Sequence, residues 1–374
     1  MGASYKHLSA SVCLLALAAC GGGGGGGASL NTNASNGPSA SSPSTNSPST
    51  NSPSTNSSSS TSSSSNTTTP PPAVTILPPT GTGVAGFGAS GSNFTTNPPA
   101  VGTDIHVAGN SVKVSTTSVA DSGIASNGIT AVYRGIVPGT SVAQFDFSIP
   151  SLSVTANNLR NDGTPVTVSG GQVAATFATM TYTLIGAWAY TQTGGGSYLG
   201  QVITGYNTVP SAVPTTGTAT YTGNPNTALG GGVIGAYFVP SGTGTITVGA
   251  LSGNVSLNAN FTANTATGSF TNMTATPATG GGAATPWNDV NFSTTFNRTS
   301  NPGAVTINGQ MTASAPPANA GSAGFAAGSP GTMIGMFYGP AAQEVGGNWY
   351  ISDPAGGTAG TNGKAAFGTF GAKQ

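Results

Sequence analysis

Residues 255–261 read Val-Ser-Leu-Asn-Ala-Asn-Phe, with an apolar side chain at every second position. In a β-strand, successive side chains point to opposite faces, so a period of two separates an apolar face from a polar one. Val305, Ile307 and Met311 repeat the pattern further along the chain. The alternation predicts half-buried strands, with one face on a core and the other in water.

Short β-type runs recur from residue 111 onward, and Gly, Asn or Pro residues separate them. The clearest runs cover residues 111–119, 129–137, 142–149 and 173–190. β-branched and aromatic side chains fill these runs, as is typical of strands. No stretch keeps an apolar helical period over ten residues, although residues 340–345 could form one helical turn. The sequence therefore predicts an all-β fold.

The composition excludes several classes of protein. Gly accounts for 59 of the 374 residues, more than twice the usual ~7%, while charged residues make up only 4% and the net charge is zero. Seven Lys and Arg residues cannot form the basic stripe that a nucleic-acid-binding protein needs. A helical bundle needs far more Leu, Glu, Lys and Arg than this chain contains. We expect no nucleic-acid partner.

The N-terminus has the features of a lipoprotein signal. Lys6 precedes an apolar stretch at residues 8–18, which has the length of a signal-peptide core and is too short to span a bilayer. The stretch ends in Leu-Ala-Ala-Cys20, which resembles the bacterial lipobox. The resemblance implies a signal peptide at residues 1–19 and acyl chains, palmitate among them, on Cys20. The alternative is an ordinary secretory signal with a chance Cys.

A low-complexity segment follows the predicted lipid attachment site. Residues 20–80 are mostly Gly, Ser, Thr, Asn and Pro and contain no charged or aromatic residue. Such a segment buries too little apolar surface to offset its ordering entropy, so we predict a disordered stalk. Residue 21 is Gly rather than the Asp that marks retention in the inner membrane. We therefore expect Cys20 to anchor the protein in lipid of the outer membrane, with the body exposed on the cell surface.

Three motifs in the second half of the chain resemble one known family. Residues 214–223 (PTTGTATYTG), 335–347 (GMFYGPAAQEVGG) and 370–374 (FGAKQ) are similar to the opening strand, a late strand and turn, and the closing strand of transferrin-binding protein B barrels. Residues 182–205 are similar to the β-region that precedes such barrels. The resemblance implies an eight-stranded antiparallel β-barrel on an outer-membrane lipoprotein. It also implies that the closing strand pairs with the strand near residues 217–221.

The body is longer than one typical domain, and the two prolines that bracket residues 211–213 predict a boundary at residues 210–214. We expect a β-rich, handle-like domain at residues 81–212 and a transferrin-binding protein B-like β-barrel domain at residues 213–374. Transferrin-binding proteins of pathogens are rich in Lys and Glu, whereas this chain is nearly uncharged, so transferrin itself is a doubtful ligand. A TonB-dependent receptor or a surface-lipoprotein translocator is the membrane partner that such a binder suggests.

Residues with catalytic or metal-binding chemistry are scarce. After removal of the signal peptide, His106 is the single His and Glu344 the single Glu. A Ser-His-Asp triad would have to use His106, and an axial haem ligand would have to be His106 or one of the few Met residues. Glu344 is expected to cap or pair locally within its turn. The three Trp residues are expected in the core rather than in a ligand platform. We predict no catalytic residue, metal site or cofactor, and no enzyme.

The function that this sequence favours is ligand binding. We expect a non-enzymatic outer-membrane surface lipoprotein that binds a solute or protein ligand through its barrel and handle loops, at residues that the sequence does not identify. The alternative function is a structural or adhesive envelope lipoprotein without a discrete ligand. The alternative architecture is a membrane-spanning barrel, which the lipobox, the stalk and the missing aromatic girdles argue against.

Overall fold

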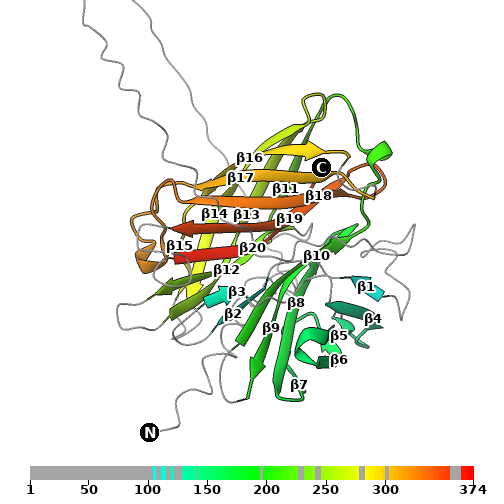
Figure 1. Cartoon of the computed structure of the whole chain (residues 1–374), viewed down its shortest axis with the longest axis vertical. Coiled ribbons are helices and arrows are strands. Elements are labelled where there is room, and N and C mark those ends of the chain that lie inside the picture. Colours follow the sequence, from blue (N-terminus) through cyan, green and yellow to red (C-terminus); the bar gives the residue numbers. More distant parts are fainter. Residues whose placement is uncertain are drawn as a thin grey trace, which may run out of the picture. The chain divides into compact units, whose positions relative to one another are not determined.

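The structure is a computed structural model. It describes residues 104–106, 111–114, 119–121, 129–140, 142–193, 197–225, 231–240, 246–277, 283–299, 303–353 and 364–374 (Figure 1). The predicted signal peptide at residues 1–19, the lipid attachment site Cys20 and the stalk at residues 20–80 lie outside the described residues. Their assignment stays a prediction.

The described residues before position 206 form two antiparallel sheets. The six-stranded sheet has the order β3-β2-β10-β9-β8-β7, and the four-stranded sheet has the order β1-β4-β5-β6. The strands of the first are β2 (Ser111–Val114), β3 (Val119–Asp121), β7 (Val166–Val168), β8 (Gly171–Thr179), β9 (Thr183–Gln192) and β10 (Ser197–Gly205). The strands of the second are β1 (Asp104–His106), β4 (Thr130–Ile136), β5 (Ala143–Ile149) and β6 (Val154–Arg160).

An aromatic core joins these two sheets into a β-sandwich. Phe145 of β5 meets Phe177 of β8 edge to face with ring centroids 5.4 Å apart, and Phe147 lies 5.9 Å from Trp188 of β9. Phe147 is fully buried and Trp188 almost so. Aromatic pairs at these separations add to the stabilisation from burial alone. Trp188 is therefore a core residue, as expected for the Trp side chains.

The described residues after position 217 form one closed sheet (Figure 1). Its strands are β11 (Thr218–Gly223), β12 (Gly232–Pro240), β13 (Ile246–Asn260), β14 (Thr265–Pro277), β15 (Thr285–Pro286), β16 (Val290–Asn297), β17 (Thr306–Ala313), β18 (Pro330–Tyr338), β19 (Glu344–Asp353) and β20 (Lys364–Lys373). The ring runs β12-β13-β14-β16-β17-β18-β19-β20 and returns to β12, and every pairing is antiparallel. The predicted eight-stranded antiparallel barrel is confirmed.

On β16 and β17, apolar side chains point into the barrel and polar ones point out. Along β16 the burial alternates strictly, with Phe292 and Phe296 buried and Ser293 and Thr295 exposed. This polarity is the reverse of a membrane-spanning barrel, whose outer band is apolar. In the described part of the chain, helical structure is limited to the 3₁₀ turns η2 (Pro150–Leu152), η3 (Pro210–Ala212) and η4 (Gly321–Ala323). None of the described helices is long and apolar enough to cross a membrane.

Two expectations about individual strands need correction. The run at residues 173–190 is not one strand but two, β8 and β9, which form a hairpin whose turn contains Met180, Thr181 and Tyr182. No Gly or Pro marks that turn, which is why composition did not reveal it. The closing strand β20 pairs with β12 over residues 365–371 and meets β11 only at Thr222 and Lys373. The expected closure against residues 217–221 is therefore wrong for most of the strand, because β12 occupies that place.

Candidate binding surfaces

The interior of the barrel is filled with side chains. Phe270 is fully buried at its centre, with its ring 5.4 Å from that of Phe292, 5.8 Å from Trp349 and 5.7 Å from Phe370. Eight-stranded barrels are just wide enough for side chains to fill. Among the described residues, Trp287 and Trp349 also belong to this core. A ligand must therefore use the outer surface of the barrel or its ends rather than the interior.

Hydrogen bonds close both ends of this core. At one end, Trp287 donates from Nε1 to the carbonyl of Ala323 at 2.7 Å. Beside it, Asn288 donates to the carbonyl of Phe325 at 2.9 Å and accepts from the backbone N–H of Phe325 at 2.8 Å. At the other end, the hydroxyl of Tyr221 donates to the carbonyl of Ala342 at 2.6 Å. Phe325 and Ala342 are thereby held as plugs, and both are fully buried.

The outer face of the barrel from β11 to β18 carries three in-register rows of uncharged polar side chains. Backbone register aligns the rows across six strands. Sixteen of these positions are Thr, Ser, Asn or Gln: Thr218, Asn260, Thr265, Thr295 and Asn308; Thr220, Asn258, Thr267, Ser293, Gln310 and Thr332; Thr222, Ser256, Ser269, Asn291 and Thr312. We call this surface the outer polar face.

The outer polar face offers many hydrogen-bonding groups and no charge. Neighbouring strands lie about 4.7–4.9 Å apart, so each row is a ladder of hydroxyl and amide groups at that spacing. Thr220 already donates to Asn258 Oδ1 at 2.8 Å across two strands. All sixteen side chains are exposed or half-buried. A neutral partner with many hydrogen-bonding groups is the chemistry that such a surface matches.

The remaining wall of the barrel, formed by β12 and β18–β20, is covered by the six-stranded sheet. Two apolar clusters span this junction. The first joins Ala174, Ala189 and Leu199 of the sheet to Ala236, Phe238, Val248, Ala365 and Phe367 of the barrel. The second joins Ile185 and Ile203 of the sheet to Ile234, Met336 and Tyr338 of the barrel and to Ala304. Strands β9, β10, β19 and β20 are therefore buried almost throughout on both faces.

Glycine makes the close approach at the junction possible. Gly346 of β19 and Gly371 of β20 are paired in register. A Cβ on Gly346 would lie 2.6 Å from Ile203 Cδ1, and one on Gly371 would lie 2.8 Å from Met180 Sδ. Neither glycine has a positive φ. Gly346 lies within strand β19, where the absence of a side chain lets the sheet pack on the barrel.

Glu344 links the two parts across 162 residues of sequence. One carboxylate oxygen accepts the backbone N–H of Thr181 at 2.8 Å, and the other accepts that of Tyr182 at 2.9 Å. Glu344 is only 1% exposed. Burial raises the pKa of Glu344, although these hydrogen bonds and Lys373, opposite it in the register, act in the other direction. The expectation of a local cap or pair is wrong, because the acceptor serves the β8–β9 turn.

A short backbone ladder lies beside this carboxylate. The N–H of Thr208 donates to the carbonyl of Phe337 at 2.9 Å, and the N–H of Gly339 donates to the carbonyl of Tyr206 at 2.7 Å. The hydroxyl of Thr208 adds a bond to the carbonyl of Gly339 at 2.6 Å. The segment that leaves β10 is thus paired with the end of β18 before the chain enters the barrel.

A comparison with protein-family models found one family whose barrels are similar to this one. The model described as C-lobe and N-lobe beta barrels of Tf-binding protein B matches residues 213–374. Residues 213–374 therefore match the barrels of the transferrin-binding protein B family. Those residues include the whole closed sheet and its opening strand β11. A comparison with curated proteins gave no match.

Solved structures of transferrin-binding protein B are also similar to the chain. A mutant of the protein from Haemophilus parasuis Hp5 is 15% identical over 72% of this chain and 60% of that one, with a TM-score of 0.33. The intact Ap-TbpB, with N and C lobes, is 15% identical over 72% and 61%, with a TM-score of 0.34. The isotype 1 protein from serogroup B Neisseria meningitidis is 15% identical over 69% and 56%, with a TM-score of 0.32. The chain spans about 60% of the length of these structures.

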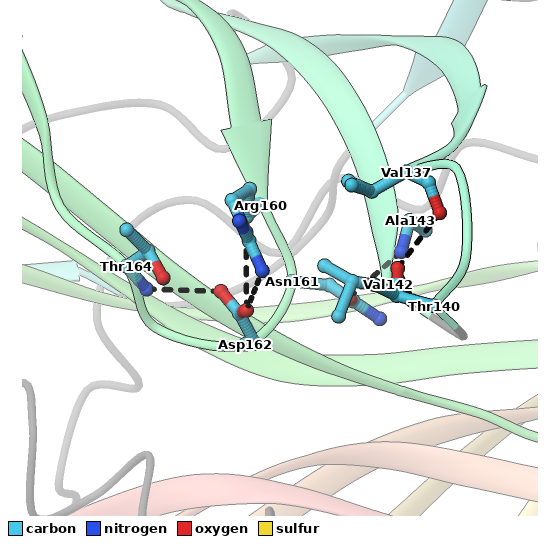
Figure 2. Close-up of polar contacts among 8 residues, drawn as sticks. All are labelled: Val137, Thr140, Val142, Ala143, Arg160, Asn161, Asp162 and Thr164. Carbon is cyan, nitrogen blue, oxygen red and sulfur yellow. Dashed lines mark hydrogen bonds and ion pairs between the residues drawn. The ribbon is translucent and has the colours of Figure 1, made fainter.

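The sandwich that precedes the transferrin-binding protein B barrel carries two of the chain's ion pairs. Arg160 contacts Asp162 with a nitrogen–oxygen distance of 2.6 Å, and Asp162 also accepts the backbone N–H of Thr164 at 3.1 Å (Figure 2). Arg134 pairs with Asp146 on neighbouring strands. Burial opposes ionisation of Asp146, but the bonds from Arg134 and the N–H of Asn158 outweigh it and lower its pKa. Each of these two pairs neutralises its own charges within the sandwich.

The sequence analysis singled out His106 as a candidate for a catalytic triad or a haem ligand. His106 ends β1 and is paired with Thr130 in the register, and its backbone is all that the structure describes. Within the described residues, no three His, Cys, Asp or Glu side chains group as metal ligands. The outer polar face and the contacts of Glu344 were missed as sites. Alternation of Thr, Ser and Asn with apolar residues signals the first, whereas no local pattern signals the second.

Proposed function

We propose that the protein is a non-enzymatic surface lipoprotein of the outer membrane that binds a solute or protein ligand on the outside of its transferrin-binding protein B-type barrel and on the preceding sandwich. The observation that carries this proposal is the family match over a barrel whose interior is filled and whose ends are plugged. Such a barrel presents surfaces and loops, and it offers a ligand no internal chamber. The near-absence of charge favours a ligand other than transferrin.

The lipid anchor supports the location in this proposal and has a direct test. Metabolic labelling with an alkyne analogue of palmitate should mark the wild-type chain, and Cys20→Ser should abolish the label. Protease added to intact cells should then remove the body of the wild-type protein, because the predicted stalk places it outside the membrane. Labelling that persists in Cys20→Ser would contradict the anchor. A body that resists protease until the outer membrane is opened would contradict the surface location.

The binding role is tested by comparing surfaces of the same folded protein. The full chain is immobilised and exposed to growth medium and to host or environmental fluids, and captured molecules are identified by mass spectrometry. Two variants that keep the core are run in parallel: Ser293→Arg/Gln310→Arg, which adds charge to the outer polar face, and Arg160→Gln, which removes charge from the sandwich. A ligand that is retained by wild type and lost by one of these variants supports the proposal. If no captured molecule distinguishes the three proteins, the result counts against the proposal.

The uncharged outer polar face supports a second candidate, a structural or adhesive envelope lipoprotein. Sixteen aligned hydroxyl and amide groups can make many weak contacts with a neutral cell-surface polymer instead of one specific contact. The two candidates differ in concentration dependence. A discrete ligand gives a saturable isotherm of defined stoichiometry, whereas adhesion gives retention that grows with the density of immobilised protein. A neighbouring gene for a TonB-dependent receptor or a surface-lipoprotein translocator would favour the first candidate.

A further inference from the structure

The outer face of the four-stranded sheet carries two β-bulges, one on each side of β5. On β4 the extra residue is Arg134, which the register with β5 skips. On β6, Asn157 and Asn158 together lie opposite the single residue Asp146 of β5. A bulge places two side chains opposite one and re-aims them, and bulges are over-represented beside functional sites. The face therefore holds more outward polar side chains than a regular sheet would.

Asp146 bonds to both bulges. Its Oδ2 accepts the Nε–H of Arg134 at 2.7 Å, and its Oδ1 accepts the backbone N–H of Asn158 at 3.0 Å. Asn158 has a φ of 56°, a left-handed conformation that is uncommon for residues other than glycine and clusters at functional sites. These contacts hold Arg134 and Asn158 in fixed positions on the outer face.

A second arginine, Arg160, lies at the end of β6. Its Nε and Nη2 both donate to Asp162 Oδ2, at 3.1 and 2.6 Å (Figure 2). Arg160 is paired in register with Gln144, which lies two residues before Asp146 on β5. Neighbouring strands are 4.7–4.9 Å apart, so the backbones of β4 and β6 lie about 10 Å from each other. Two arginines with fixed side chains thus flank the same stretch of β5.

The arginines, rather than the aspartates, keep hydrogen-bonding capacity for a partner. Both oxygens of Asp146 are engaged, and Asp162 bonds to Arg160 through one oxygen and to the N–H of Thr164 through the other. A guanidinium has five N–H groups, and these contacts engage only Nε and Nη2 of each. The side chains of Arg134 and Arg160 are 44% and 33% exposed. The planar group that matches such a donor fork is a carboxylate.

The end of the β4–β5 hairpin adds an apolar surface. Ile136 is 48% exposed and is one of two large apolar side chains that are exposed among the described residues. Pro138 is also exposed, and Val137 is half-buried. The N–H of Val137 donates to the carbonyl of Val142 at 2.8 Å, and the hydroxyl of Thr140 donates to the carbonyl of Val137 at 2.8 Å. These bonds hold the apolar end in one conformation.

Asn161 ties this hairpin end to the end of β6. The N–H of Ala143 donates to Asn161 Oδ1 at 3.0 Å, and the N–H of Asn161 donates to the carbonyl of Ala143 at 3.1 Å (Figure 2). Ala143 is paired in register with Ile136, and Asn161 follows Arg160 in the chain. The apolar end and the arginines therefore lie in one small region. We call its surface, formed by Arg134, Ile136, Pro138, Asn158 and Arg160, the arginine–isoleucine patch.

This combination of side chains matches a protein interface. Interfaces depend on a few anchors, among which Arg is enriched, with apolar groups at the centre and polar groups around them. Side chains that are already fixed lose less entropy on binding. We propose that the arginine–isoleucine patch is the docking site of a protein partner that presents Asp or Glu carboxylates beside an apolar recess. The inference rests on the binding function proposed above and adds the class of partner and the surface.

Selection of peptides by the full chain tests the proposal. Peptides enriched from a displayed library of random linear sequences are synthesised, and their affinities are measured by fluorescence anisotropy. We expect enrichment of peptides that combine Asp or Glu with Leu, Ile, Val or Phe. Arg134→Gln and Ile136→Ser should each weaken their binding by about tenfold or more. Arg134→Lys should also weaken it, because Lys keeps the charge and lacks the planar fork.

Two controls separate docking from net charge and from folding. Arg160→Gln combined with Thr295→Arg keeps the net charge of the wild type but moves the cation to the outer polar face. This double variant should bind the peptides as weakly as Arg160→Gln alone. Melting temperatures of all variants should stay close to that of the wild type, because exposed ion pairs contribute little to stability.

Three outcomes would overturn the proposal. If Arg134→Gln and Ile136→Ser bind the enriched peptides as tightly as the wild type, the patch is not the docking site. If the enriched peptides lack acidic residues, or if none is enriched, the proposed partner chemistry is wrong. If the wild type instead binds polygalacturonate through Arg134 and Arg160, the partner is an acidic polysaccharide. A ligand that the wild type and all these variants capture from fluids would leave the binding function standing and place its site elsewhere.

Discussion

Replacing Glu344 by Gln isolates the contribution of one carboxylate to the junction between the sandwich and the barrel. Gln keeps one oxygen but presents an amide group where the second carboxylate oxygen accepted a backbone N–H, so either Thr181 or Tyr182 loses its acceptor. An unsatisfied buried donor costs about 1–3 kcal/mol. Removing a buried negative charge returns part of that cost, because burial already raises the pKa of Glu344. We expect a net loss of about 1–2 kcal/mol of unfolding free energy.

Thermal unfolding and amide hydrogen exchange measure this change together. A loss of 1 kcal/mol lowers the melting temperature of a protein of this size by roughly 2–4 °C. Exchange should accelerate at Thr181 and Tyr182 and stay unchanged within β16. Gln310→Glu, the reverse change on the exposed outer polar face, is the matched control and should alter stability by less than about 0.5 kcal/mol. An unchanged melting temperature together with unchanged exchange at both amides would refute the role assigned to Glu344.

The same pair of proteins predicts a pH dependence with a defined sign. The pKa of Glu344 in the folded state lies above its ordinary value of 4.5, so the unfolded state loses this proton first as the pH rises. Its contribution to stability is therefore fully present below that value and is lost as the pH rises through the folded-state pKa. The wild type should gain stability relative to Glu344→Gln as the pH is lowered from 7 toward 4.5. If the stability advantage of wild type over Glu344→Gln instead decreases as the pH falls from 7 toward 4.5, the hydrogen bonds lower the pKa of Glu344 more than burial raises it.

Three further changes probe the barrel. Phe270→Ala removes the aromatic ring at the centre of the barrel core and should lower the free energy of unfolding, measured by chemical denaturation, by about 3–5 kcal/mol. Thr267→Ala, at an exposed position on the same strand, is the control and should cost only a few tenths of a kcal/mol. Gly371→Val places a side chain against Met180 and should destabilise the sheet–barrel contact by about 1–3 kcal/mol, seen as faster exchange in β9. Deleting residues 364–374 removes β20, which pairs with both β19 and β12, and should abolish the cooperative melt; a surviving transition would contradict the closed ring.

The alternation of residues predicted strands with one buried face, and the resemblance of three motifs to a known family predicted that these strands form a barrel. The alternation around Leu257 and Phe261 reports burial on one side only, and the structure buries both residues in the barrel core. The same reasoning is weaker where a strand is buried on both faces. In β9 and β10 every second residue faces the other sheet of the sandwich and the rest face the barrel, so the alternation disappears. The hairpin turn at Thr181 was hidden within that continuous run.

The junction could not be predicted because its partners are distant in sequence. Glu344 and Thr181 are 163 residues apart, and nothing in either local stretch specifies the other. The apolar cluster at the junction likewise joins β9 and β10 to β12 and β20, which are distant from them in the sequence. Local pattern carries information about which face of a strand is buried. It carries none about which distant strand covers that face.

The pairing of β12 with β20 has a consequence for how the chain acquires its structure. The barrel closes through its last strand, so the ring stays open until residues 365–371 are available to bond with residues 232–238. Contacts between such distant segments make folding slow, because the loop must close before any pairing stabilises it. Until that moment Leu199 and Ile203 lack the wall that covers them in the finished protein. A chain whose β20 has not yet paired would therefore expose the apolar surface of β10 to other chains, and aggregation through β10 is the hazard of that interval.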